Sequence, residues 1–244
     1  MKLLKTGSFF LLLLSSLYAQ SAKEIVERVD KNMRGETLSM KMSVKISSFG
    51  HTRTMKMQTY SEGNKKSFVK TLYPPKDKGI TFLSLNNQMW QYVPKIERVI
   101  KIPPSMMLQN WMGSDITNDD MVKQSSIVED YTPKIIKREG KLVTVELTPK
   151  EDSAVVWGKI ISVVDTTHYT NVKDTFYDEE GEAVRTFSYS DVKQFGAYYA
   201  PTIWRIEPLG KEGSFTEIKI EDVVYDTKIP SHYFKKSALK RFSR

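Results

Sequence analysis

The sequence predicts a mainly β protein with α-helices, in which one antiparallel sheet curls around an apolar interior behind an N-terminal amphipathic helix. After residue 35, apolar residues recur at every second position in one segment after another, and Gly, Pro and Asn turns separate these segments. No rhythm of strands and long helices suggests a parallel sheet, so successive hairpins are expected. About a dozen strands with polar outer faces must curl to bury their apolar faces.

The first 19 residues are typical of a secretory signal peptide. Lys2 and Lys5 precede an apolar run over 9–14, which ends in small and polar residues. This run is shorter than the ~20 residues that a bilayer span needs. We expect cleavage after Ala19, which removes two of the charges that give the chain its formal net charge of +8. Residues 20–244 would then be a single exported domain, and the absence of cysteine suits a bacterial periplasm.

The expected helix covers 22–34. Ser21 and Glu24 have the spacing of a capping box, apolar residues follow at helical intervals, and Gly35 is a natural stop.

After this helix the apolar period changes to two: residues 38–46 alternate strictly, and the next strand places Met55 and Met57 on one face. Further strands are expected near 66–73, 80–85, 88–93, 97–102, 133–138, 141–148, 155–164, 168–177, 183–190, 198–207 and 214–225, and a short helix is expected at the C-terminal end.

The segment 103–124 interrupts the strands. Leu108, Trp111 and Met112 lie at i, i+3 and i+4, which predicts a helix with one apolar face. Residues 114–118 can cap a second short helix, and capping explains the nearby aspartates better than a calcium loop does. We expect this insert to lie over the mouth or the concave face of the sheet.

Ten methionines remain after cleavage, and all of them fall between Met33 and Met121. They have two interpretations. They can fill gaps in a core beneath a helix, or they can form an adaptable lining for a flexible apolar ligand such as an acyl chain.

Sequence motifs for other functions are missing. The chain has no cysteine, no HExxH, no GxSxG, no P-loop and no GxGxxG pattern, so nothing argues for an enzyme, a metal or a cofactor. Lys and Arg are spread along polar strand faces, which argues against a nucleic-acid partner.

Three segments, 89–94 (MWQYVP), 98–103 (RVIKIP) and 111–120 (WMGSDITNDD), carry a family resemblance, and the capped first helix, the hairpins and the C-terminal ending from Ile229 to Phe234 agree with it. The three segments resemble the outer-membrane lipoprotein-sorting protein family of the LolA-like superfamily. The resemblance implies a half-open antiparallel β-barrel that encloses a helical lid, with a hydrophobic cavity for acyl chains. It also implies a donor in the inner membrane and an acceptor in the outer membrane.

We therefore expect a monomeric periplasmic carrier for the acyl chains of a lipoprotein or a lipid. The alternative is an accessory protein that binds an inner-membrane exporter and carries nothing. The expected cavity walls are Met40, Met42, Met55, Met57, Trp90 and Tyr92, and the expected cover is Met106, Met107, Leu108, Trp111 and Met112.

Overall fold

The computed structural model describes residues 20–123, 127–153 and 155–244. Its centre is one antiparallel sheet of thirteen strands in the order β6-β5-β4-β3-β2-β1-β13-β12-β11-β10-β9-β8-β7. The mainly β, antiparallel class predicted from the sequence is confirmed, whereas the expected signal peptide lies outside the described residues. The strands are β1 (Thr37–Ser48), β2 (His51–Glu62), β3 (Lys66–Tyr73), β4 (Thr81–Leu85), β5 (Gln88–Val93), β6 (Arg98–Ile102), β7 (Tyr131–Glu139), β8 (Leu142–Pro149), β9 (Lys159–Asp165), β10 (Thr170–Tyr177), β11 (Ala183–Phe195), β12 (Tyr198–Pro208) and β13 (Phe215–Tyr225).

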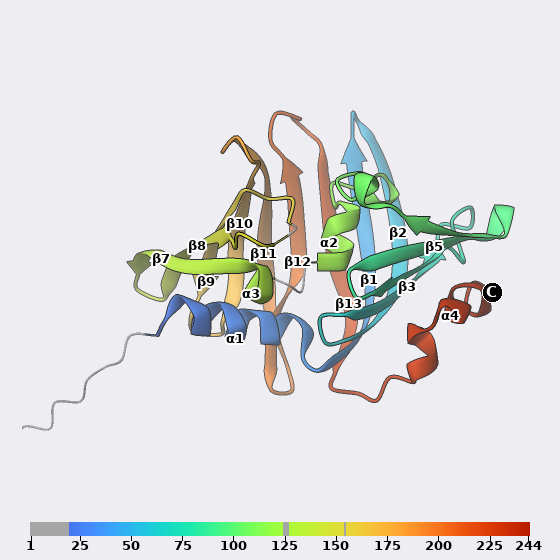
Figure 1. Cartoon of the computed structure of the whole chain (residues 1–244), viewed down its shortest axis with the longest axis horizontal. Coiled ribbons are helices and arrows are strands. Elements are labelled where there is room, and N and C mark those ends of the chain that lie inside the picture. The colour runs from blue at the N-terminus through green and yellow to red at the C-terminus, as the bar shows by residue number, and fades with distance from the viewer. Residues whose placement is uncertain (1–19, 124–126, 154) are drawn as a thin grey trace, which may run out of the picture.

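The sheet consists of two meanders that meet in the middle. β1 to β6 follow one another across one half, β7 to β13 follow one another across the other, and the join is the pairing of the first strand with the last. This pairing runs from Leu38 opposite Tyr225 to Ser47 opposite Phe215. The sheet curls about this join into an open half-barrel (Figure 1).

Helix α1 (Ala22–Arg34) lies across one end of the half-barrel, in front of the β7–β12 half (Figure 1). The predicted capping box is present: the Ser21 hydroxyl accepts from the Glu24 amide, and the Ser21 amide donates to Glu24 Oε2 at 2.8 Å. Its buried residues, Ile25 and Val26 among them, join the main core. Gly35 ends the helix with φ +57°, a conformation that favours glycine.

Residues 103–123, here called the covering segment, pack against the concave face. They form two 3-10 turns, Pro104–Met106 and Trp111–Gly113, and the short helix α2 (Asn118–Lys123), which α3 (Ile127–Asp130) follows. Trp111 and Val122 are buried in the same core as the inward residues of β1 and β2. Figure 1 shows α2 and α3 on the same side of the sheet as α1.

The C-terminal end covers the opposite, convex face of β3, β4 and β5. The 3-10 turn Ser231–Phe234 and helix α4 (Lys236–Arg241) bury a second apolar cluster there, and the Thr81 hydroxyl donates to the Leu239 carbonyl at 2.7 Å. The predicted short final helix is therefore present. This second cluster consists of Phe68, Leu83, Trp90, Tyr92, Ala238 and Leu239.

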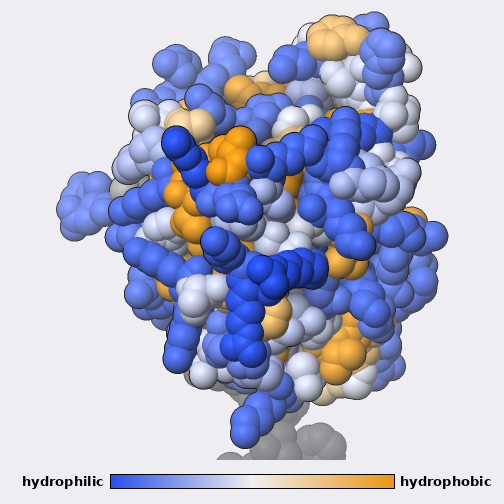
Figure 2. Space-filling view, turned by 90° about the vertical axis from the view of Figure 1, so that its right-hand side faces the viewer, coloured by the Kyte–Doolittle hydropathy of each residue, from blue (hydrophilic) through white to orange (hydrophobic). Residues whose placement is uncertain are grey.

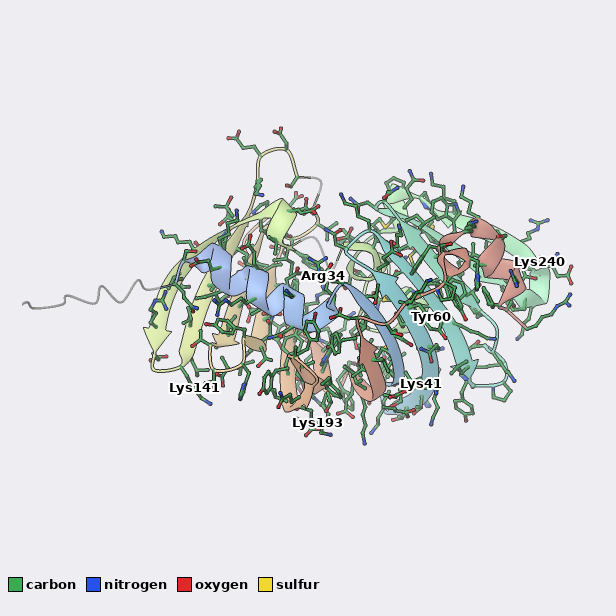
Figure 3. All side chains as sticks on the ribbon, turned by 90° about the horizontal axis from the view of Figure 1, so that it is seen from below. Arg34, Lys41, Tyr60, Lys141, Lys193 and Lys240 are labelled. Atoms are coloured by element: carbon green, nitrogen blue, oxygen red, sulfur yellow. The ribbon has the colours of Figure 1, made fainter. Side chains whose placement is uncertain are left out.

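The outer surface is mainly polar. Lys41, Lys141, Lys193 and Lys240 are exposed around the periphery of the molecule (Figure 3). The face shown in Figure 2 is largely hydrophilic, and its apolar patches are small and separate. Among residues 20–123, 127–153 and 155–244, no helix is long and apolar enough to cross a membrane.

Candidate functional site

A cavity of about 260 Å³ lies between the concave face of the sheet, α1 and the covering segment. One water molecule occupies roughly 30 Å³ in the liquid, so the space is much larger than a packing defect. Both halves of the sheet contribute to its wall, because inward side chains alternate along each curled strand. The apolar lining includes Val26, Val29, Leu38, Met40, Met42, Val44, Val69, Trp111, Val122, Ile160, Val164, Phe176, Phe187, Trp204 and Ile218.

Residues 109–118 of the covering segment form a hydrogen-bonded loop and not a helix. The Trp111 amide donates to the Ile116 carbonyl at 2.7 Å, and the Asn118 amide donates to the Gln109 carbonyl at 3.0 Å. Met112 adopts φ +51°, which no α-helix accommodates. The predicted helix with one apolar face is therefore wrong: Trp111 is buried, whereas Leu108 is 58% exposed.

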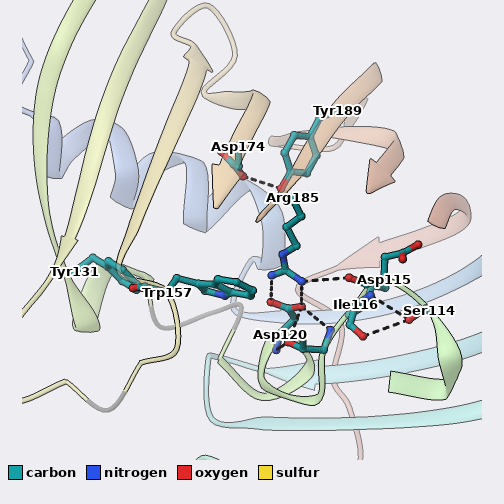
Figure 4. Close-up of polar contacts among 10 residues, drawn as sticks. Ser114, Asp115, Ile116, Asp120, Tyr131, Trp157, Asp174, Arg185 and Tyr189 are labelled. Atoms are coloured by element: carbon teal, nitrogen blue, oxygen red, sulfur yellow. Dashed lines mark hydrogen bonds and ion pairs between the residues drawn. The ribbon is translucent and has the colours of Figure 1, made fainter. Parts of the chain in front are cut away.

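Side chains from three strands fix the covering segment to the sheet. The Arg53 guanidinium of β2 donates to the Met112 carbonyl, and the Thr216 hydroxyl of β13 donates to Asp115 Oδ2 at 2.7 Å. Arg185 of β11 makes the third contact, a two-pronged ion pair with Asp120 at 2.6 and 2.5 Å (Figure 4). The cover is thus tied to strands in both halves of the sheet.

The Asp120–Arg185 ion pair is buried, with the side chains 10% and 5% exposed. Asp120 Oδ2 also accepts from the Thr117 amide and hydroxyl, so Asp120 forms the expected cap as well as the ion pair. The guanidinium stacks over Trp157 and Phe176, with its carbon 4.2 and 4.5 Å from the ring centroids. This packing makes the pair a rigid fastening of α2 to β11.

A second polar group lines the cavity on the β9–β11 side. Tyr189 donates its hydroxyl to Asp174 at 2.8 Å (Figure 4), and the Asn171 amide donates to both carboxylate oxygens at 3.0 and 2.8 Å. Burial raises the pKa of Asp174, although hydrogen bonds from Ser162, Tyr189 and Asn171 oppose the shift. Burial also raises the pKa of Tyr189 well above its ordinary value, and the neighbouring Asp174 carboxylate adds to that shift.

An ion pair at the end of α1 lines the cavity as well. Asp30 and Arg34 lie one turn apart and contact each other. Burial raises the pKa of Asp30, and the Arg34 guanidinium opposes that shift. Among the described ranges of the chain, no group of three or more His, Asp or Glu side chains is arranged to hold a metal ion.

Several solved structures resemble this fold. Residues 63–241 match a family model described as "Uncharacterized protein", and the comparison with curated proteins gives no match. A DUF1329 family protein from Desulfovibrio piger superposes with a TM-score of 0.83 at 22% identity, over 89% of this chain and 97% of that one. A putative outer membrane lipoprotein-sorting protein domain from Vibrio parahaemolyticus gives 0.79 at 23% identity, over 90% and 98%. A LolA superfamily protein from Nitrosomonas europaea gives 0.77 at 21% identity, over 90% and 100%. This chain belongs to the matched family and has the LolA-like fold.

Only some of the residues expected from the sequence line the cavity. Met40, Met42 and Trp111 line it. Met55 and Met57 are fully buried in the same core without lining the cavity. The other expected cover residues lie around this core: Met106, Met107 and Met112 pack against it partly buried, and Leu108 points to solvent.

Trp90 and Tyr92 require a correction, because they do not face the cavity. Strand β5 is buried on both faces: Met89 lies in the main core, and Trp90 and Tyr92 on the opposite face lie in the cluster beneath α4. Alternation assigns Trp90 and Tyr92 to one face but does not reveal which face is concave. They anchor the C-terminal helix instead.

Sequence reasoning missed the polar residues of the site. Arg185 lies in phase with Phe187 and Tyr189 along β11, and Asp174 lies two residues before the buried Phe176 of β10. A charged residue at an inward position is the signal that could have found both.

Proposed function

We propose that this protein is a periplasmic carrier that binds the acyl chains of a lipoprotein or a lipid in the cavity. It would act as a monomer that takes its cargo from an inner-membrane transporter and delivers it to an outer-membrane acceptor. The observation that carries the proposal is the apolar cavity of about 260 Å³ across the centre of the half-barrel. The printed name of the Vibrio relative, a putative lipoprotein-sorting domain, agrees with it.

The physical reason is the hydrophobic effect. Each CH₂ group moved from water into such a cavity gains about 0.8 kcal/mol, so a single acyl chain supplies enough free energy for stable binding. Binding alone needs no catalytic group. A carrier must also release its cargo, so part of the wall must move. The covering segment is the part proposed to move, since it consists of loops and short helices outside the sheet ladder, and its polar contacts with β2, β11 and β13 would have to open for release.

The first experiment asks whether lipid is present. Native mass spectrometry of the protein isolated from its own periplasm should detect co-bound lipid, and the delipidated protein should take up a fluorescent acyl probe. Absence of both would leave the alternative expected from the sequence, an accessory protein that carries nothing.

A matched pair of variants then tests the place of binding. Val164 lines the cavity, whereas Val145 is fully buried in the same core on the neighbouring strand and does not line it. Val164→Phe should fill the cavity, weaken probe binding and cost little stability. Val145→Phe should cost about 1–3 kcal/mol by overpacking and leave the affinity for the probe unchanged. Equal loss of stability in the two variants, with uptake intact in both, would contradict the proposed site.

A further inference from the structure

The lining of the cavity is mainly apolar, and one polar corner of it, apart from the Asp30–Arg34 pair and Asp120, is formed by Ser162, Asn171, Asp174 and Tyr189. These residues come from the adjacent strands β9, β10 and β11, and all four line the cavity. The Asp174 carboxylate accepts from the Tyr189 hydroxyl at 2.8 Å and from the Asn171 amide at 2.8 and 3.0 Å. The corner therefore presents acceptor atoms to whatever occupies the cavity.

Among the residues that the structure describes, no cationic side chain pairs with the Asp174 carboxylate of this corner. Asp174 is only 4% exposed, its hydrogen-bond donors are neutral, and it takes part in no ion pair within the described ranges. Arg185, which comes from the same strand as Tyr189, gives its two-pronged contact to Asp120. A buried carboxylate without a cation is costly unless it is protonated or a cation joins it.

A second acceptor in the corner is also unused. The side-chain oxygen of Asn171 is buried and has no hydrogen-bond partner in the described part of the chain, because the amide nitrogen of the same side chain faces the carboxylate. Buried polar atoms in native proteins normally have partners, so an orphan beside an unpaired carboxylate needs an explanation. If the cluster served only to join β10 to β11, an apolar pair or a neutral amide would do so without burying an unpaired charge or an unpartnered oxygen.

We propose that this corner binds a hydrogen-bond-donating group, an ammonium or a hydroxyl, on an otherwise apolar ligand, and that it disfavours fatty-acid carboxylates. This inference rests on the proposed function, because it assigns the polar end of the same ligand. A donor placed here satisfies Asp174 and the Asn171 oxygen together. A carboxylate placed here meets two acceptors and a like charge.

The test compares three probes of equal chain length at neutral pH: dodecylamine, dodecanol and dodecanoate. Each competes for the cavity of the delipidated mature protein with a neutral apolar dye, N-phenyl-naphthylamine. We expect the amine, the alcohol or both to displace the dye at a concentration about tenfold or more below that of dodecanoate. Preference for the amine over the alcohol identifies an ammonium, and the reverse identifies a hydroxyl.

The failures of the two proposals are distinguishable. Equal displacement by all three probes, or best displacement by dodecanoate, overturns the polar-corner inference but leaves an acyl carrier. No dye binding and no displacement by any probe overturns the carrier and the inference together.

Variants locate the effect. Asp174→Asn removes the charge at constant size and should abolish the discrimination against dodecanoate, whereas Asp222→Asn makes the same change at an exposed position of β13 and should preserve it. Dye binding shows that each variant keeps its cavity. If Asp174→Asn does not fold, Tyr189→Phe provides the second test: it removes one donor to the carboxylate, so discrimination against dodecanoate should persist or increase. Loss of discrimination in Tyr189→Phe, with dye binding intact, would contradict the role of Asp174.

Discussion

Replacing Arg185 with methionine should destabilise this protein more than most single substitutions. The change keeps an apolar side chain but removes a charge that contacts Asp120 at 2.6 and 2.5 Å and the Asp115 carbonyl at 3.2 Å. The Asp120 carboxylate then stays buried with only the Thr117 amide and hydroxyl as donors. The variant also loses the cation–π contact with Trp157.

The size of the effect follows from burial. Removing one partner of a buried ion pair costs about 3–5 kcal/mol, whereas exposed pairs contribute about 0–1 kcal/mol. In a chain of this length, 1 kcal/mol corresponds to roughly 2–4 °C in Tm, so a drop of roughly 6–20 °C is expected. Urea unfolding followed by tryptophan fluorescence measures the free energy directly.

The double variant decides whether the pair is responsible. Asp120→Asn combined with Arg185→Met should be more stable than the sum of the two single losses predicts, by about 1 kcal/mol or more, because the second change removes the charge that the first left unpaired. Additive losses, or a loss below about 1 kcal/mol for Arg185→Met alone, would refute the buried fastening of α2 to β11.

Three further predictions concern other parts of the molecule. Trp111 Nε1 is buried and has no hydrogen-bond partner among the described residues, so Trp111→Phe should change the unfolding free energy by about 1 kcal/mol or less, against about 3–5 kcal/mol for Trp111→Ala. Similar losses for the two variants in urea unfolding would show that the indole N–H has a partner. Leu239→Ala, on the convex side, should cost about 2–5 kcal/mol without changing acyl-probe affinity, and a titration that shows weaker binding would contradict the separation of the two clusters. Burial raises the pKa of Asp174 above its ordinary 3.8, so the folded protein binds this proton more tightly than the unfolded chain does. The unfolding free energy of the wild type should therefore fall relative to that of Asp174→Asn as pH rises from 3.8 through the raised pKa. Urea unfolding at several pH values measures this, and parallel stability curves for the two proteins would count against it.

Much of the fold could be predicted because its signals are local. The capping box fixes the start of α1 at Ser21, and strict alternation over 38–46 identifies β1 and the face that it buries. The Gly, Asn and Pro residues between strands identify the turns. Such patterns depend only on neighbours in the chain, so one sequence suffices to read them.

The site was harder to predict because it depends on which side of the sheet is covered. Trp90 and Tyr92 have the same pattern as cavity residues, but α4 covers their face. Leu108 lies at helical spacing from Trp111, yet hydrogen bonds between 109–111 and 116–118 replace the helix with a loop. The partners of Asp174 and Asp120 come from other strands, and no local pattern in a single sequence shows such long-range contacts.

The pairing of β1 with β13 also sets the order of assembly. Each meander can form from its own hairpins, but the central ladder needs residues 37–48 and 215–225 at the same time. Closing so long a loop is slow and comes late in folding. A chain that lacks residues 215–225 therefore cannot form the central ladder, and the cavity wall that spans the two meanders is complete only when both strands of this ladder are present.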